Sequence, residues 1–188
     1  MRRTTGSRSA PVLLAEADDR YPTRHLERLG ADAPLQLVTV GNLDLLAHAK
    51  IALFCSARCP GSAILATYDR AAQWREEGRC IISGFHSPVE KECLSILLRG
   101  SSPIIICPGR AIEAMRISAE CRTAFDSGRM LFLSPFTKRP TRVTKESASR
   151  RNEVVAALAD EAYIAHVAPG GKTSEIVKML NEWKVSML

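Results

Sequence analysis

Residues 51–61 read IALFCSARCPG, and residues 62–67 continue as SAILAT. An apolar run leads into a turn of small residues around Ser56 and Arg58, and a helical pattern begins after Pro60-Gly61. We interpret this stretch as a buried strand, a tight turn and a helix whose N-terminus faces the turn. Such a turn offers backbone N–H groups and the positive end of a helix dipole to an anion, and Arg58 adds a guanidinium. The stretch therefore predicts a site for phosphate or for a nucleic-acid backbone.

The same order of strand and helix repeats along the rest of the chain. Further strands are expected at residues 79–83, 103–107, 130–134 and 162–167, and helices at 63–77, 88–98, 145–159 and 173–183, with short helical pieces at 111–115 and 119–125. Continuous apolar strands separated by helices indicate a parallel sheet that is covered on both faces. The predicted fold class is α/β: a Rossmann-like, doubly wound, mainly parallel sheet of five to six strands with helices on both faces.

The chain before residue 50 is expected to differ from the rest. Residues 1–19 are predicted to be a flexible N-terminus. Residues 20–49 are predicted to be a short lead-in segment that packs on the main domain, with a short helix that stops at Gly30 and a short strand at residues 37–40. The main Rossmann-like domain is expected to span residues 50–188.

The composition is that of an ordinary globular domain, with 46% hydrophobic and 24% charged residues in a chain of 188. The net charge of +6 permits an anionic partner without requiring one. The six cysteines include no C-x2-C pair of the kind that binds zinc, so we expect buried free thiols in a reducing compartment. The sequence shows neither a signal peptide nor a membrane span, and we predict a cytoplasmic protein with no membrane partner.

Short polar turns follow the predicted strands, and the carboxyl ends of parallel strands meet at one edge of a sheet. Most of these turns carry glycine, hydroxyl or basic residues, which supply the donors that phosphate oxygens accept from. The predicted phosphate-binding residues are Ser56, Arg58, Ser62, Ser83, Gly84, His86, Ser87, Arg110, Arg151, Asn152, Gly170, Gly171, Lys172 and Thr173. Each has a structural alternative: glycines make tight turns, Ser83 or Ser87 caps the helix at 88–98, and Arg58 is a solvated charge.

A basic segment, TKRPTRVTKESASRRN, spans residues 137–152 and leads from a strand into a helix. Most of its charges are expected to be solvated, whereas Arg150, Arg151 and Asn152 adjoin apolar helix positions and are expected to be held by the helix. The chain has no GxGxxG fingerprint after the first strand of the main domain and no complete GxxxxGK[ST] loop. It also has no Ser-His-Asp order or paired carboxylates that would name a reaction. We therefore predict no cofactor and no metal.

Several stretches resemble the DprA (Smf) family of DNA-processing proteins, which lies within a wider Rossmann-like group that includes the LOG proteins. The likeness covers about residues 20–180. It is carried by Tyr21-Pro22 and Gly41-Asn42-Leu43 in the lead-in, Ile81-Ile82-Ser83-Gly84, Ser134-Pro135-Phe136, and residues 151–160, which resemble the family's RNRiIagLSd. The chain departs from the family where Ala57 is inserted into the Gly-Ser-Arg turn, where the GID motif is missing, and where residues 169–175 replace SGsLiTA.

The resemblance implies a protein that binds single-stranded DNA through a basic pocket at the strand-end edge. It also implies a homodimer that helps to load a RecA-type recombinase, in bacterial DNA recombination and natural transformation. By the same likeness, Arg58 and Arg151 would contact phosphates.

The LOG proteins supply the alternative interpretation. Their motif PGGxGTxxE is similar to residues 169–175, PGGKTSE, which are shorter by two residues. The chain would then be a LOG-like nucleoside monophosphate phosphoribohydrolase, in which Glu175 stabilises an oxocarbenium-like centre, or a non-catalytic nucleotide sensor. Because the spacing differs, we expect a binding protein more than an enzyme.

Overall fold

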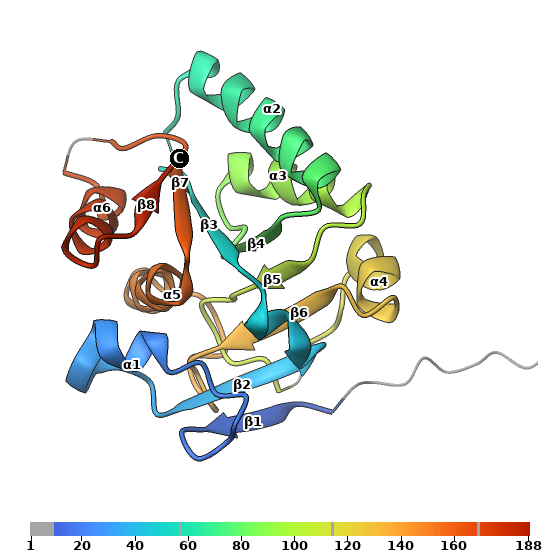
Figure 1. Cartoon of the computed structure of the whole chain (residues 1–188), viewed down its shortest axis with the longest axis vertical. Coiled ribbons are helices and arrows are strands. Elements are labelled where there is room, and N and C mark those ends of the chain that lie inside the picture. Colours follow the sequence, from blue (N-terminus) through green and yellow to red (C-terminus); the bar gives the residue numbers. More distant parts are fainter. Residues whose placement is uncertain (1–9, 57, 114, 169) are drawn as a thin grey trace, which may run out of the picture.

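The structure is a computed structural model that describes residues 10–56, 58–113, 115–168 and 170–188. In these residues eight strands form one sheet in the order β1-β2-β6-β5-β4-β3-β7-β8 (Figure 1). The strands are β1 (Val12–Ala15), β2 (Gln36–Gly41), β3 (Lys50–Phe54), β4 (Cys80–Ser83), β5 (Ile104–Ile106), β6 (Met130–Ser134), β7 (Glu161–Ile164) and β8 (Ser186–Met187). The helices are α1 (Arg24–Leu29), α2 (Gly61–Glu77), α3 (Pro88–Leu98), α4 (Ala119–Asp126), α5 (Lys145–Leu158) and α6 (Lys172–Glu182), with short 3-10 helices η1 (Gly30–Asp32) and η2 (Leu43–Ala47).

The predicted α/β class is confirmed, but the described sheet has eight strands instead of five or six. Strands β6, β5, β4, β3, β7 and β8 are parallel, while β2 and β1 are antiparallel at one edge. Strands β8 and β1 were not predicted, because β8 is only two residues long and the four residues of β1 are too few for a periodic signal.

Strand β1 corrects the prediction that residues 1–19 are flexible. Leu14 is fully buried and pairs with Leu37 of β2, so residues 12–15 are part of the sheet. Residues 1–9 lie outside the described part of the chain. The helical piece expected at residues 111–115 is also wrong, because residues 111–113 and 115 are not helical.

Helices cover both faces of the sheet, as the continuous apolar strands predicted. Helices α1, α5 and α6 lie on one face, and α2, α3 and α4 lie on the other (Figure 1). All five residues of β3 are buried, and Trp74 of α2 packs edge-to-face on Tyr163 of β7 with ring centroids 5.3 Å apart. The core is therefore two apolar layers separated by the sheet.

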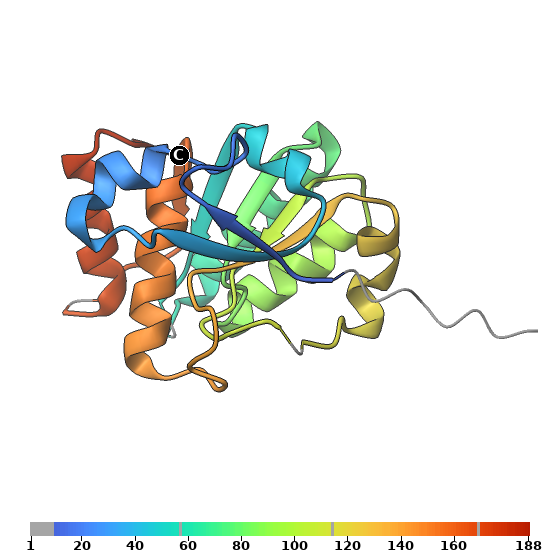
Figure 2. The same ribbon diagram turned by 90° about the horizontal axis from the view of Figure 1, so that it is seen from below.

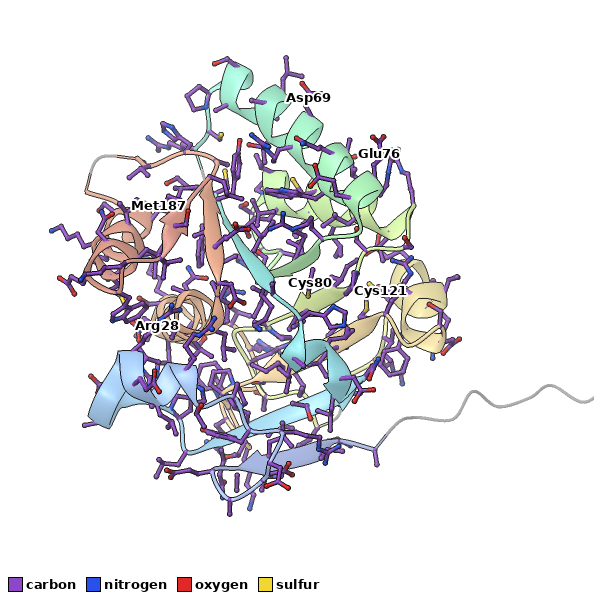
Figure 3. The ribbon with its side chains drawn as sticks, in the orientation of Figure 1. Arg28, Asp69, Glu76, Cys80, Cys121 and Met187 are labelled. Carbon is purple, nitrogen blue, oxygen red and sulfur yellow. The ribbon has the colours of Figure 1, made fainter. Side chains whose placement is uncertain are left out.

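The six cysteines are free thiols, as expected, and five of them are buried while Cys59 is half-buried. Cys80 belongs to the apolar layer under α5, and Cys121 of α4 belongs to the opposite layer (Figure 3). Burial raises the pKa of Cys80 to about 12, so this thiol stays protonated at neutral pH. These cysteines act as small apolar residues.

The lead-in segment packs tightly against the rest of the chain. Strand β2 pairs with β6, and Arg28 of α1 reaches the last turn of α5. Its Nη1 donates to the carbonyl oxygens of Ala157 (3.0 Å) and Ala159 (2.6 Å). Arg28 lies between α1 and α5 in Figure 3. A cation at this helix end satisfies free carbonyl groups and opposes the negative end of the helix dipole.

Candidate nucleic-acid interface

The loops after β3, β4, β5, β6 and β7 converge at the carboxyl edge of the parallel strands, which we call the rim. They lie along the lower side of the sheet in Figure 2. The first loop leads into α2, the second into α3, the fourth into α5 and the last into α6. The sequence predicted this convergence, because parallel strands place all of their carboxyl ends on one side.

Ser56 joins the first loop of the rim to the last. Its hydroxyl donates to Thr173 Oγ1 (3.0 Å) and accepts from the backbone N–H of Ala168 (3.0 Å). Its own N–H donates to the carbonyl oxygen of His166 (3.2 Å). Thr173 lies in the first turn of α6, where Gly171 is the N-cap. The structure therefore brings Ser56, Gly171 and Thr173 together, as the sequence predicted.

Ser83 and Ser87 have structural roles inside the fold, and one of them caps a helix, as the structural alternative predicted. Ser83 is fully buried, and its hydroxyl donates to the Leu53 carbonyl oxygen (2.9 Å) and accepts from the Phe85 N–H (3.1 Å). Ser87 is the N-cap of α3, where its side chain accepts from the Glu90 N–H (3.2 Å). Both hydroxyls are therefore engaged inside the fold, and their contact with a phosphate stays a prediction.

Glu90, whose place in the sequence predicts a charge at the start of a helix, is a residue of the rim that is not among the predicted phosphate-binding residues. Glu90 is 7% exposed, and its carboxylate accepts hydrogen bonds from three backbone N–H groups. Oε1 accepts from Cys55 (3.0 Å), and Oε2 accepts from His86 (2.8 Å) and Ser87 (3.1 Å). The Ser-x-x-Glu spacing at 87–90 is a capping-box signal and predicts the bond to Ser87. The bond to Cys55 joins residues 35 positions apart and has no local sequence signal.

Arg151 lies beneath the rim and is only 3% exposed. Its Nη1 donates to the carbonyl oxygen of Cys107 (2.9 Å), and its guanidinium lies directly over Gly84. A Cβ at residue 84 would stand 1.7 Å from Nη1, so only glycine leaves room for this side chain. Burial lowers the pKa of Arg151, and the negative charge of Glu90 opposes that shift. The predicted contact of Arg151 with a phosphate stays a prediction, since the guanidinium is not presented to solvent.

Other predicted residues lie at the surface of the rim. Arg58, Ser62, His86, Gly170 and Lys172 are exposed, while Arg110, Asn152, Gly171 and Thr173 are half-buried. Lys172 pairs with Glu175 (3.0 Å), and Arg150 pairs with Glu153 (3.0 Å). Within the described ranges, Arg58, Lys138, Arg139 and Arg142 form no ion pair with a carboxylate. These four charges are therefore available to an anionic ligand.

The loop after β6 adds a hollow of about 700 Å³ beside these charges. It is lined by Phe136, Arg139, Pro140, Thr141, Arg142 and Thr144. The backbone of this loop is held by Ser134, whose hydroxyl accepts from the Phe136 N–H (3.1 Å) and donates to the Arg110 carbonyl oxygen (2.8 Å). Guanidinium and hydroxyl groups around one aromatic ring suit an anionic, partly apolar ligand such as a nucleotide unit.

Two negative findings apply to the described residues alone. No group of three or more His, Cys, Asp and Glu side chains is arranged to hold a metal ion there. No helix in that part of the chain has the length and apolar character needed to cross a membrane.

The sequence matches the family described as DNA recombination-mediator protein A over residues 12–172. A search of curated proteins finds no match. By structure, the chain is similar to DNA processing protein A (DprA) from Streptococcus pneumoniae, with a TM-score of 0.76 and 21% identity over 94% of this chain and 61% of that one. It is also similar to DprA from Helicobacter pylori, with a TM-score of 0.73 and 18% identity over 96% of this chain and 81% of that one. The Helicobacter structure is described as giving insight into a unique single-stranded DNA binding mode.

At these identities the two solved structures show a shared fold. The chain spans about three fifths of the length of the pneumococcal protein. The family match covers most of the sequence, including the strand-end loops after β3, β4, β5 and β6, and it confirms the resemblance found in the sequence motifs. The chain belongs to the DNA recombination-mediator protein A family.

Proposed function

We propose that this chain binds single-stranded DNA at the rim, through contacts between exposed basic side chains and backbone phosphates. The observation that carries the proposal is the set of four exposed cations, Arg58, Lys138, Arg139 and Arg142, which have no carboxylate partner in the described part of the chain. Phosphate oxygens accept charge-assisted hydrogen bonds from such groups. A relative in the same family, from Helicobacter pylori, is described as binding single-stranded DNA, which supports this choice of ligand.

The proposal predicts that Arg58→Ala weakens binding of a single-stranded oligonucleotide by roughly tenfold at low salt, because one charge-assisted phosphate contact is lost. The slope of log K against log salt should become shallower by about 0.7, the value for one phosphate contact on a single strand. Fluorescence anisotropy with a labelled oligonucleotide at several salt concentrations measures both quantities.

Arg99→Ala is the matched control, because Arg99 is an exposed arginine just after α3, at the opposite edge of the sheet. It should leave both affinity and slope unchanged. Should Arg58→Ala bind like the parent at every salt concentration, Arg58 makes no phosphate contact and the proposal loses its main residue.

A nucleotide is the second candidate ligand, favoured by one observation. The Ser56–Thr173 bond holds the start of α6 against the turn after β3, and a helix N-terminus next to a hydroxyl-rich turn suits a phosphate group. For the hydrolase version, Glu175 is exposed and its carboxylate pairs with Lys172. Chromatography of the common nucleoside monophosphates decides this version: free base must form with the parent and not with Glu175→Ala.

The remaining parts of the proposal come from membership of the family. We include a homodimer, a RecA-type recombinase as partner, a role in DNA recombination, and a cytoplasmic location, which suits the free thiols. Sedimentation of the protein alone and with DNA tests the dimer, and co-sedimentation with a purified recombinase tests the partner.

A further inference from the structure

We infer that Glu90 is the positioning residue of the rim: its carboxylate fixes the loops after β3 and β4 in the one arrangement that receives DNA phosphates. The inference rests on the proposed function, since the rim must bind DNA for the arrangement to matter. Glu90 itself is buried and has no part in contacting the ligand. It acts through the backbone of the two loops.

The geometry for this role is direct. Oε1 accepts from the N–H of Cys55 in the loop after β3, three residues before Arg58. Oε2 accepts from the N–H groups of His86 and Ser87 in the loop after β4. One buried carboxylate therefore joins the loop after β3 to the loop after β4 through hydrogen bonds to their backbone N–H groups. The same N–H groups would otherwise be free to bind an anion, so Glu90 occupies the inner donors and leaves the outer cations for the ligand.

The loop after β4 needs such a support because its backbone is strained. Phe85 is buried and has a φ of 45°, a left-handed conformation that side chains other than glycine and asparagine rarely adopt. Its own N–H is held by the hydroxyl of Ser83, and the next N–H, that of His86, is held by Glu90. Without the carboxylate, the second anchor of this strained turn is gone.

The interior of the rim also holds a buried cation, Arg151. Arg151 is 3% exposed, and the negative charge of Glu90 partly offsets the effect of burial on its guanidinium. This arrangement is possible because residue 84 is a glycine, over which the guanidinium lies. Arg151 and Glu90 form no ion pair within the described residues, so the carboxylate of Glu90 is held by the backbone N–H groups of the two loops.

If Glu90 acts by positioning the loops, a variant without the carboxylate should bind DNA more weakly, whereas if Glu90 acts only through its charge, the variant should bind DNA more tightly. A buried negative charge beneath a phosphate site repels DNA, so its removal alone would strengthen binding. Loss of the anchor would let both loops move and would weaken binding. The variant Glu90→Gln keeps the size of the side chain, but its amide NH₂ cannot accept a hydrogen bond, so at least one loop loses its anchor.

We expect Glu90→Gln to bind a single-stranded oligonucleotide about tenfold more weakly than the parent, at a temperature well below the melting temperature of the variant protein. The slope of log K against log salt should be unchanged, because no phosphate contact is removed. Glu90→Asp keeps the charge but is shorter by one methylene, and it should also weaken binding because it cannot reach both loops. The control is Glu92→Gln, which neutralises an exposed carboxylate two residues away in the same helix and should leave the affinity close to that of the parent. Unchanged or tighter binding by Glu90→Gln, or unchanged binding by Glu90→Asp, overturns the inference.

Hydrogen exchange without DNA separates this inference from the proposed function. In Glu90→Gln and Glu90→Asp, the amide of residue 55, or those of residues 86 and 87, should exchange at least tenfold faster than in the parent. Faster exchange in a protein whose parent form does not bind DNA supports the anchoring while the proposed function fails. Unchanged exchange at all three amides overturns the inference whatever the DNA binding shows.

Discussion

The two edges of the parallel sheet differ in whether their basic side chains are paired with carboxylates. At the amino edge, Lys50 is 7% exposed, and its Nζ donates to the carbonyl oxygens of Leu46 (3.1 Å) and His48 (2.6 Å). It also lies 3.4 Å from Asp160 Oδ2, and Asp160 forms a second ion pair with Arg24 of α1. At the rim, by contrast, the exposed arginines such as Arg58 and Arg142 form no pair with a described carboxylate.

The difference shows that the carboxylates at the two edges of the sheet have different roles. Asp160 neutralises cations and thereby joins the lead-in segment to the sheet. Glu90, at the other edge, accepts bonds from backbone N–H groups and is not paired with an exposed cation. The ion pairs of Asp160 at the amino edge therefore hold the fold together, whereas Arg58, Lys138, Arg139 and Arg142 at the rim stay available for a ligand. A variant at the amino edge should therefore change stability alone, whereas a variant at the rim should also change DNA binding.

The largest effect on stability is expected at the amino edge. Asp160→Ala leaves the buried Lys50 ammonium without a carboxylate and removes the acceptor of the Lys50 N–H (2.8 Å). Loss of one partner of a buried pair lowers the free energy of unfolding by about 3 kcal/mol or more. Urea unfolding followed by circular dichroism measures the change. Affinity for single-stranded DNA should stay that of the parent in conditions where the variant is folded.

Asp69→Ala is the control for this variant, because Asp69 is exposed on the outer side of α2 (Figure 3). It should change the free energy of unfolding by less than about 0.5 kcal/mol. A similar, small change for both variants would mean that the cluster around Asp160 does not stabilise the fold, and the contrast between the two edges would disappear.

A smaller loss of stability is expected under the rim. Gly84→Ala places a Cβ 1.7 Å from Arg151 Nη1, so the guanidinium or the loop must move. Forcing an extra carbon into such a packed site destabilises by about 2 kcal/mol, and DNA binding should weaken too because the loop after β4 shifts. Gly61→Ala is the control, since no other group lies within 4 Å of a Cβ built there. Equal stability and equal DNA affinity of Gly84→Ala and the parent would show that the guanidinium moves aside without affecting the rim.

Most of the fold is predictable from the sequence because its strands are continuous apolar runs. The stretch 51–56 is buried throughout, and the helices after β3, β4 and β6 begin close to where the turn residues predict. The edges are less predictable: β1 and β8 are so short that only pairing with a neighbour defines them. Local patterns carry no information on such pairing.

The candidate site was predictable as a place but not as a set of contacts. The order of strands and helices puts Ser56, Ser83 and Thr173 at one edge, but it cannot distinguish a hydroxyl that faces solvent from one that bonds inside. The same holds for Arg151, whose charge suggested a surface contact and which is buried over Gly84. Burial of a charge depends on residues far away in sequence, here Gly84, Glu90 and Cys107.

The smallest effect is a pH dependence that also belongs to the amino edge. His25 of α1 is fully buried, its Nε2 lies 2.8 Å from the Tyr21 hydroxyl, and its Nδ1 has no hydrogen-bond partner among the described residues. Burial lowers the pKa of His25 from its usual 6.5, and the hydrogen bonds to backbone oxygens only partly oppose this shift. Below pH 6.5 His25 binds a proton in the unfolded chain but not in the folded chain. The free energy of unfolding should therefore fall with decreasing pH, by at most about 1.4 kcal/mol per pH unit.

His25→Gln should lose this dependence in urea unfolding between pH 5 and pH 7 (roughly the range in which a histidine titrates), while His48→Gln, at an exposed position, should keep it. If His25→Gln shows the parent's pH profile, His25 is charged or accessible in the folded protein. The amino edge would then hold a group that is open to solvent, and the difference between the two edges would be one of degree.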